Sequence, residues 1–292
     1  MGLDINGVRF LLYSKKMGAD FEKSVMIGRQ TLDLTKQELS HNLRAFGYPA
    51  TNQAVNNIYE ENGYAELLFK YLGAQSIHSI DYSNYEGATH LYDLNNDIPD
   101  GEMEGYTAVI DGGSLEHIFN FPAAIKNCMK MLKVGGCYLG ITPANNFLGH
   151  GFYQFSPELY FSIFTKQNGF ELVHLIAFED IPAPTWYSVK KPIEIKERIS
   201  VVNNQPIYLL ILARKIEKVS IFATTPQQSD YLATWEDQLD HANYPALPIQ
   251  RRLLNWAKRN LPAFVKHILK GIKEGHGFNP RFFTPMDPFE DT

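Results

Sequence analysis

Three side chains that could bind a ligand or move a proton lie close together near the middle of the chain. Asp111 follows an apolar run, residues 107–110, and Glu116 and His117 come five and six residues later. An imidazole with a pKa near neutrality can accept a proton from an oxygen or nitrogen nucleophile. We therefore expect Glu116 and His117 to be catalytic; the alternative is a histidine that only caps the next helix.

A second group of candidates lies in a glycine-rich, aromatic loop about thirty residues further on. His150 stands between Gly149 and Gly151, with aromatic residues on both sides. The two glycines let the backbone approach a bound molecule closely. We expect His150 to join the catalytic group and the loop to contact the substrate; aromatic packing is the alternative. The predicted substrate contacts are Asn145, Asn146 and Tyr153.

The pattern around these residues predicts an open α/β sheet. The run at residues 107–110 ends in Asp111, a helical pattern follows, and Gly135-Gly136 precede a second run at residues 138–141. Strand, acidic turn, helix, glycine turn and strand are typical of α/β folds, whose ligands bind at the carboxyl ends of the strands. Asp111, Glu116 and His117 all fall at such an end.

Other apolar runs predict the rest of the sheet. Further strands are expected at residues 23–28, 76–80 and 89–92, and edge strands at 170–178 and 206–213. Helices are expected at residues 8–16, 64–72 and 157–164, and another begins at Thr35, where Glu38 completes a capping box. Residues 50–63 are polar and are predicted to form an active-site loop or lid.

These elements predict one seven-stranded, mostly parallel, doubly wound sheet of the Rossmann-like kind, with a helical C-terminal extension. Residues 1–22 would form a helical cover, 23–215 the main domain, and 216–292 the extension. Residues 227–240 read as an acidic helix or loop, and the last residues as an extended tail. Residues 250–273 are basic and amphipathic, so they either pack on the main domain or make a weak contact with an anionic membrane surface.

The succession of strand ends resembles the class I S-adenosylmethionine-dependent methyltransferases, in a divergent small-molecule form. The strands end in Gly28, Asp81, Asp93 and Asp111, and Leu-Glu-His after the fourth strand is followed by Leu-Lys-Val-Gly-Gly before the fifth. The resemblance implies S-adenosylmethionine as cofactor. It implies that Asp81 holds the ribose hydroxyls, that Asp93 and Leu94 meet the adenine, and that Asp111 and Gly112 lie beneath the methionine part.

The chain departs from this pattern after the first strand, where such enzymes carry a glycine-rich turn. Here Gly28 is followed by Arg29 and Gln30, two long side chains. Arginine binds carboxylates well, so we expect Arg29 or Gln30 to reach the methionine carboxylate. The departure also favours an alternative, a non-catalytic binding or scaffold protein with this fold. The basic segment at residues 250–273 is the only feature that would make such a protein peripheral to a membrane.

The resemblance also bears on metal binding. Some quinone-type methyltransferases of this fold bind a divalent metal through Glu-x-x-Glu-His. Gly113 stands here at the position of the first glutamate. We therefore expect no metal ligands in this motif.

Composition excludes several other classes. A formal charge of -5 and a pI near 6.0 argue against nucleic-acid binding. No apolar run reaches the ~18 residues of a membrane span, and no signal peptide is expected. The two cysteines, Cys128 and Cys137, fall in predicted core elements, which suits reduced thiols in the cytoplasm. We expect an enzyme that methylates a small-molecule or sugar-like acceptor, and the sequence indicates no particular oligomeric state.

Overall fold

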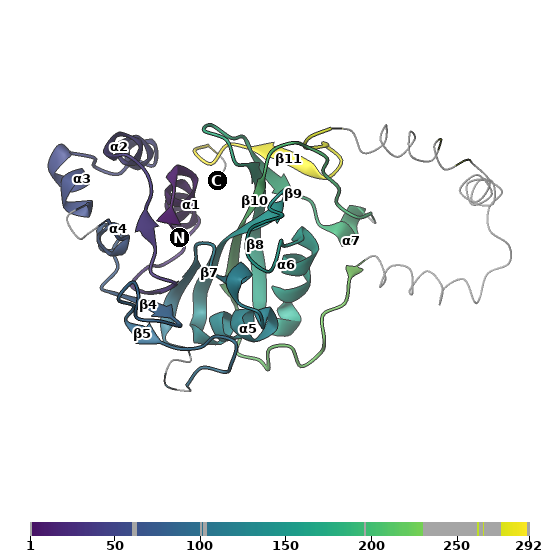
Figure 1. Ribbon diagram of the computed structural model, residues 1–292, viewed down its shortest axis with the longest axis horizontal. Helices are drawn as coiled ribbons and strands as arrows, with labels where there is room; N and C mark the ends of the chain where they lie inside the picture. The colour runs from purple at the N-terminus through teal and green to yellow at the C-terminus, as the bar shows by residue number, and fades with distance from the viewer. Residues whose placement is uncertain are drawn as a thin grey trace.

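A nine-stranded sheet forms the centre of the computed structural model, in the order β11-β9-β8-β10-β7-β6-β2-β4-β5 (Figure 1). The structure describes residues 2–59, 63–99, 101, 104–195, 197–229, 262, 265 and 276–290. The strands are β2 (Lys23–Ile27), β4 (Ser76–Asp81), β5 (His90–Leu91), β6 (Tyr106–Asp111), β7 (Leu132–Asn145), β8 (Phe170–Glu179), β9 (Trp186–Val189), β10 (Ile207–Lys215) and β11 (Phe283–Met286). All of them run in one direction except β9 and β10.

Helices cover both faces of this sheet. On one face, α5 (Phe121–Met131) and α6 (Pro157–Ile163) bury their apolar sides in a common core. On the other face, α1 (Ile5–Lys16), α2 (Lys36–Ala45) and α4 (Glu66–Tyr71) pack into a second core. Strand β6 is buried along its whole length, as expected for a parallel strand covered on both faces. The predicted doubly wound, mostly parallel α/β fold is thus confirmed.

The order of the strands creates a switch point next to β2. The chain runs from β2 to β4 and β5 on one side of the sheet and then returns to β6 and β7 on the other. Strand β2 pairs in parallel with both β4 and β6. In open α/β sheets, a crevice opens at the carboxyl ends of the strands where the connections diverge in this way.

Three helices separate β2 from β4 and explain the long spacing between Gly28 and Asp81. After the short strand β3 (Thr31–Leu32), which pairs with β1 (Gly2–Leu3), α2 begins with the predicted capping box of Thr35 and Glu38. Helix α3 (Asn52–Ile58) follows, so the prediction of a loop or lid over residues 50–63 was wrong for that stretch. Thr51 caps this helix, and its buried residues are Val55 and Ile58. The neighbouring asparagines made the apolar periodicity too weak to predict a helix from the sequence.

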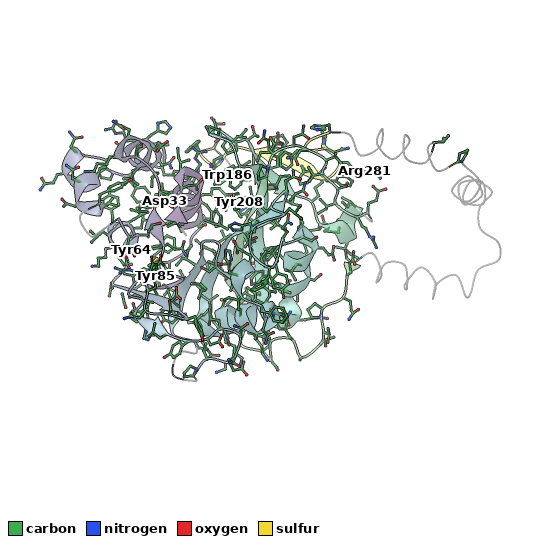
Figure 2. The ribbon with its side chains drawn as sticks, viewed as in Figure 1. Asp33, Tyr64, Tyr85, Trp186, Tyr208 and Arg281 are labelled. Atoms are coloured by element: carbon green, nitrogen blue, oxygen red, sulfur yellow. The ribbon has the colours of Figure 1, made fainter. Side chains whose placement is uncertain are left out.

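The N-terminal helix is fixed to the sheet by aromatic contacts. The ring of Tyr13 on α1 lies 5.9 Å from that of Trp186 on β9, in a T-shaped arrangement. Phe178 packs against both Trp186 and Tyr208, two residues labelled in Figure 2. Helix α1 is therefore an integral layer of the fold.

The antiparallel side of the sheet is larger than predicted. Strands β8 and β10 form at the expected residues and pair with each other, but β9 and β11 extend the sheet beyond β8. The expected seven strands therefore become nine. The predicted extended tail supplies β11, drawn in yellow in Figure 1, and Pro285 is accommodated because β11 is the outermost strand.

Other predicted elements differ mainly in length. The expected third strand is reduced to β5, and the expected fifth strand grows into β7. The side chain of Ser156 caps α6 as predicted, and Cys128 and Cys137 are buried free thiols. The expectations for residues 230–240 and for most of residues 250–273 lie outside the described residues. In the described part of the chain, each helix is too short or too polar to cross a bilayer.

Candidate functional site

A cavity of about 380 Å³ opens at the switch point of the sheet. Its walls come from the ends of β2 and β4, from the segment after β5 and from the turn after β6. This volume is in the range of small-molecule sites. The lining residues are Ile27, Gly28, Ile80, Asp81, Tyr82, Tyr92, Asp93, Leu94, Asn95, Ser114, His117 and Ile118.

Gly28 forms the turn where β2 enters this cavity. Its φ is 71°, in the left-handed region that residues with a side chain adopt only at a cost. Its backbone N–H donates to the Ile80 carbonyl at 2.8 Å, which joins the turn to the neighbouring strand. Of the glycine-rich turn that the resemblance leads one to expect, this chain has one glycine, Gly28, where the backbone borders the cavity.

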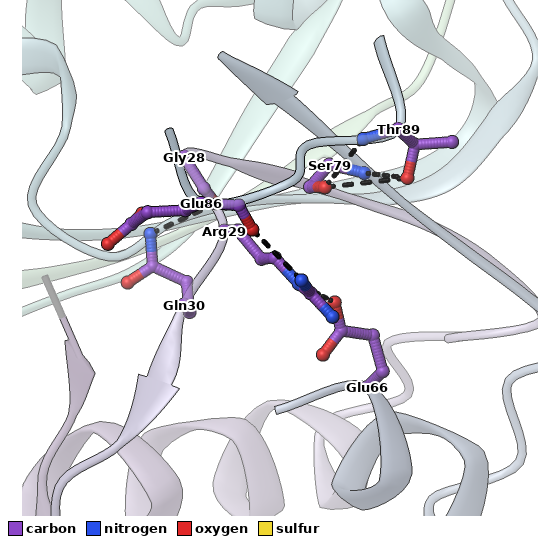
Figure 3. A network of polar contacts seen from close by, with 7 residues as sticks. All are labelled: Gly28, Arg29, Gln30, Glu66, Ser79, Glu86 and Thr89. Atoms are coloured by element: carbon purple, nitrogen blue, oxygen red, sulfur yellow. Dashed lines mark hydrogen bonds and ion pairs between the residues drawn. The ribbon is translucent and has the colours of Figure 1, made fainter. Parts of the chain in front are cut away.

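Gln30 supports this turn from inside the protein (Figure 3). Its side chain is fully buried, and Nε2 donates to the carbonyls of Ile27 at 2.9 Å and Gly28 at 3.3 Å. A Cβ atom at Gly112 would lie 2.4 Å from Oε1 of Gln30, so a larger residue at position 112 would force the end of this side chain to shift. Gln30 and Gly112 thus shape the turn without lining the cavity.

Arg29 does not line the cavity, and its guanidinium contacts Glu66 and Glu86 (Figure 3). Its Nε lies 2.7 Å from the Glu66 carboxylate, and Nη1 donates to the Glu86 carbonyl at 2.9 Å. The guanidinium also lies 3.8 Å from the ring centre of Tyr64. Arg29 thus links the turn at Gly28 to α4. The guanidinium that we expected to bind a cofactor carboxylate forms an ion pair with Glu66 instead.

Two of the predicted acids do line the cavity. Asp81 ends β4, and its Oδ1 accepts the backbone N–H of Ser83 at 3.0 Å. Asp93 accepts hydrogen bonds from Asn95 and Asn96, which hold the pKa of its carboxyl below the usual value. Asp93 therefore stabilises its own turn and places Leu94, a buried apolar residue, on the cavity wall.

Asp111 ends β6 and is completely buried. Its Oδ1 accepts from the backbone N–H groups of Ser114 at 2.8 Å and Leu115 at 3.3 Å, and Oδ2 accepts from the Tyr138 hydroxyl at 3.1 Å. Burial outweighs these bonds and raises the pKa of Asp111 to about 6. The carboxylate organises the turn that carries Glu116 and His117.

Glu116, His117 and His150 converge beside the cavity. Oε1 of Glu116 lies 3.4 Å from Nε2 of His150, and the two imidazole rings have centroids 5.0 Å apart. Burial, with a smaller effect of Asp111, raises the pKa of Glu116 to about 8. Burial and the neighbouring His150 lower the pKa of His117 and favour its neutral form. The structure therefore brings the three predicted catalytic side chains together.

The three predicted substrate residues lie elsewhere in the same region. Asn146, with a φ of 62°, donates to the carbonyls of Asn203 and Gln205, and Asn145 donates to the side chain of Asn203. Tyr153 donates to the Phe119 carbonyl at 2.6 Å. Their polar groups hold loops together, and none of the three borders the cavity at Gly28.

Several cavity residues were not singled out from the sequence. Tyr82, Tyr92 and Asn95 flank the strand-ending acids, and Ser114 and Ile118 flank the turn at Glu116 and His117. Tyr82 is 79% exposed, so the cavity wall carries an uncovered aromatic ring. Tyr85, labelled in Figure 2, follows three residues later and is 92% exposed. A signal that could have identified four of the cavity residues is their position within three residues of a strand-ending acid; these are Tyr82, Tyr92, Asn95 and Ser114.

Comparison with known proteins found similar solved structures but no similar sequence family. No family model matches the sequence, and no curated protein matches it. A protein from Bacillus halodurans described as a methyltransferase is 14% identical, covers 71% of this chain and 99% of its own, and has a TM-score of 0.40. One from Listeria monocytogenes described as an S-adenosylmethionine-dependent methyltransferase is 19% identical, with coverage of 72% and 99% and a TM-score of 0.39.

The branched-chain polyamine synthase of Thermus thermophilus, in complex with N4-aminopropylspermidine and 5'-methylthioadenosine, is also similar in structure. It is 12% identical, covers 76% of this chain and 59% of its own, and has a TM-score of 0.36. At these values none of the likenesses identifies a function for this chain.

Proposed function

We propose that this protein transfers a methyl group from S-adenosylmethionine to a small-molecule or sugar-like acceptor. The observation that carries the proposal is the cavity at the switch point, which combines a backbone turn at Gly28 with the carboxylate of Asp81 and the apolar wall at Leu94. Nucleotide cofactors of doubly wound α/β proteins bind at this place in the sheet. The fit rests on the residues of this chain and not on its distant structural neighbours.

The lining of the cavity suits a nucleoside. A carboxylate at the end of the strand next to the glycine turn can accept hydrogen bonds from two vicinal ribose hydroxyls, which is the role proposed for Asp81. Leu94, Tyr92 and Ile118 supply apolar surface for a flat purine ring. The glycine turn lets the backbone at Gly28 approach the ligand closely.

His117 is the group proposed to accept the proton of the acceptor. S-adenosylmethionine, when bound, would supply the methyl group from its positively charged sulfur. Loss of the methyl group converts this sulfonium into a neutral thioether. His117 lines the cavity, and its lowered pKa keeps the imidazole neutral and able to take a proton from a hydroxyl or amine. The remaining rate acceleration would come from positioning the acceptor in line with the methyl group.

Calorimetric titration with S-adenosylhomocysteine tests the cofactor part of the proposal. Asp81→Asn should weaken binding by about 1–3 kcal/mol, because the ribose hydroxyls lose a charged acceptor. Asp97→Asn is the matched control, since Asp97 is exposed and, among the described residues, forms its ion pair with Lys130 at the surface. Undetectable binding to the unmodified protein at millimolar ligand, or equal affinity of both variants, would contradict the assignment of this cavity.

A further inference from the structure

Glu116, His117 and His150 have the composition and spacing of a metal site. One ligand atom from each, an imidazole nitrogen or a carboxylate oxygen, lies within 4.8 Å of the others. Ligands bound about 2.1 Å from a common ion lie up to about 4 Å apart. A small rotation of the side chains would therefore bring the three atoms onto one ion.

The carboxylate of Glu116 provides an independent sign that a ligand is missing. The side chain is 1% exposed, and neither of its oxygens accepts a hydrogen bond. Nε2 of His150 lies 3.4 Å from Oε1 of Glu116. A buried carboxylate normally has several donors or a cation beside it, because leaving it unpaired is costly. Both oxygens of Glu116 are thus available to a positive ion.

The backbone holds His150 next to this carboxylate. The N–H groups of Phe152 and Tyr153 donate to the Glu116 carbonyl, at 2.7 and 3.3 Å. Gly151 has a φ of 66°, and a Cβ atom there would lie 2.8 Å from the same carbonyl oxygen. The glycine next to His150 therefore permits a close contact that a larger residue would prevent. The loop is docked onto the turn that carries the other two ligands.

We propose that Glu116, His117 and His150 bind one divalent transition-metal ion of the zinc type. Two imidazoles and one carboxylate suit zinc and similar ions, whereas magnesium and calcium prefer sets of oxygen ligands. Three protein ligands leave a fourth position open, as in catalytic zinc sites. His117 also lines the cavity, so an ion held by these three side chains would lie beside the cavity wall. The inference does not depend on the proposed cofactor site. In the ion-bound protein His117 would be a ligand and would not act as the proposed base, because a neutral imidazole has only one nitrogen lone pair.

Titration of the untagged, chelator-treated full chain with zinc chloride tests this site. Calorimetry should give one tight equivalent of Zn²⁺, and His150→Asn and Glu116→Gln should each weaken its binding at least about tenfold, the usual cost of losing a metal-site residue. His41→Asn, which changes an exposed histidine on α2, should bind Zn²⁺ as the unmodified protein does. Co²⁺ bound at the same site should show a visible spectrum that His150→Asn removes.

The proposal fails if no saturable equivalent of Zn²⁺ binds, if neither substitution weakens it, or if His41→Asn weakens it as much. It also fails if Mg²⁺ at equal concentration displaces Zn²⁺. His150 lies in a half-exposed loop, so its variant keeps the test decisive even if the buried Glu116→Gln variant does not fold. Binding of S-adenosylhomocysteine is measured separately, so failure of one proposal leaves the other intact.

Discussion

Gly28→Val should weaken binding of S-adenosylhomocysteine at least about 100-fold. A branched residue at a φ of 71° is strongly disfavoured, so the turn would have to change its backbone conformation. The new side chain would also stand where the backbone borders the proposed nucleoside site. Both effects remove the close approach of the backbone on which the site depends.

Gly47→Val is the matched control for this substitution. Gly47 has a φ of 78°, and a Cβ atom there would meet nothing within 4 Å. The control therefore carries the same backbone strain at a place remote from the cavity. Thermal unfolding of the two variants compares the strain, and calorimetry compares the affinities. If Gly28→Val binds the nucleoside as tightly as Gly47→Val, the cavity has been assigned wrongly.

Asp111→Ala should lower the free energy of unfolding by about 3 kcal/mol near neutral pH. The substitution leaves three buried donors without their acceptor, the N–H groups of Ser114 and Leu115 and the hydroxyl of Tyr138. Asp111→Asn keeps an oxygen for the two N–H groups, so it should cost clearly less. Denaturant unfolding of both variants measures the difference, and equal losses would contradict the role given to Asp111.

The same comparison has a defined dependence on pH. Burial raises the pKa of Asp111 from 3.8 to about 6, so the folded protein favours the neutral carboxyl. The contribution of Asp111 to the free energy of unfolding is therefore fully present below the pKa that its carboxyl group has in the unfolded chain. This contribution is lost as the pH rises through about 6. Relative to Asp111→Asn, the unmodified protein should lose about 2 kcal/mol between about pH 4 and pH 7. If the free energies of unfolding of the unmodified protein and of Asp111→Asn change with pH in the same way, Asp111 does not titrate between about pH 4 and pH 7.

The sequence predicted those parts of the fold that rest on local patterns. Apolar runs ending in Asp81 and Asp111 became β4 and β6, and the capping box at Thr35 began α2. The strand ends also predicted which residues would meet, because parallel strands bring their carboxyl ends to one edge of the sheet. Gly28, Asp81, Asp93, Leu94 and His117 accordingly line one cavity.

Contacts between distant segments could not be predicted in the same way. The pairing of Arg29 with Glu66 depends on where α4 lies, and no local pattern fixes that position. Asn146 was expected to face a substrate, but it donates to a loop almost sixty residues further along the chain. Strand β11 joins the sheet only because β9 offers it an edge. Each of these features is a tertiary contact that overrides the expectation drawn from neighbouring residues.

A crystal structure of the full chain soaked with S-adenosylhomocysteine tests the central claim most directly. We predict electron density in the cavity at Gly28, with the ribose hydroxyls on Asp81 and the adenine against Leu94. The thioether sulfur should face His117, the proposed base. Density for the nucleoside at another place, or a ribose without a contact to Asp81, would contradict this account.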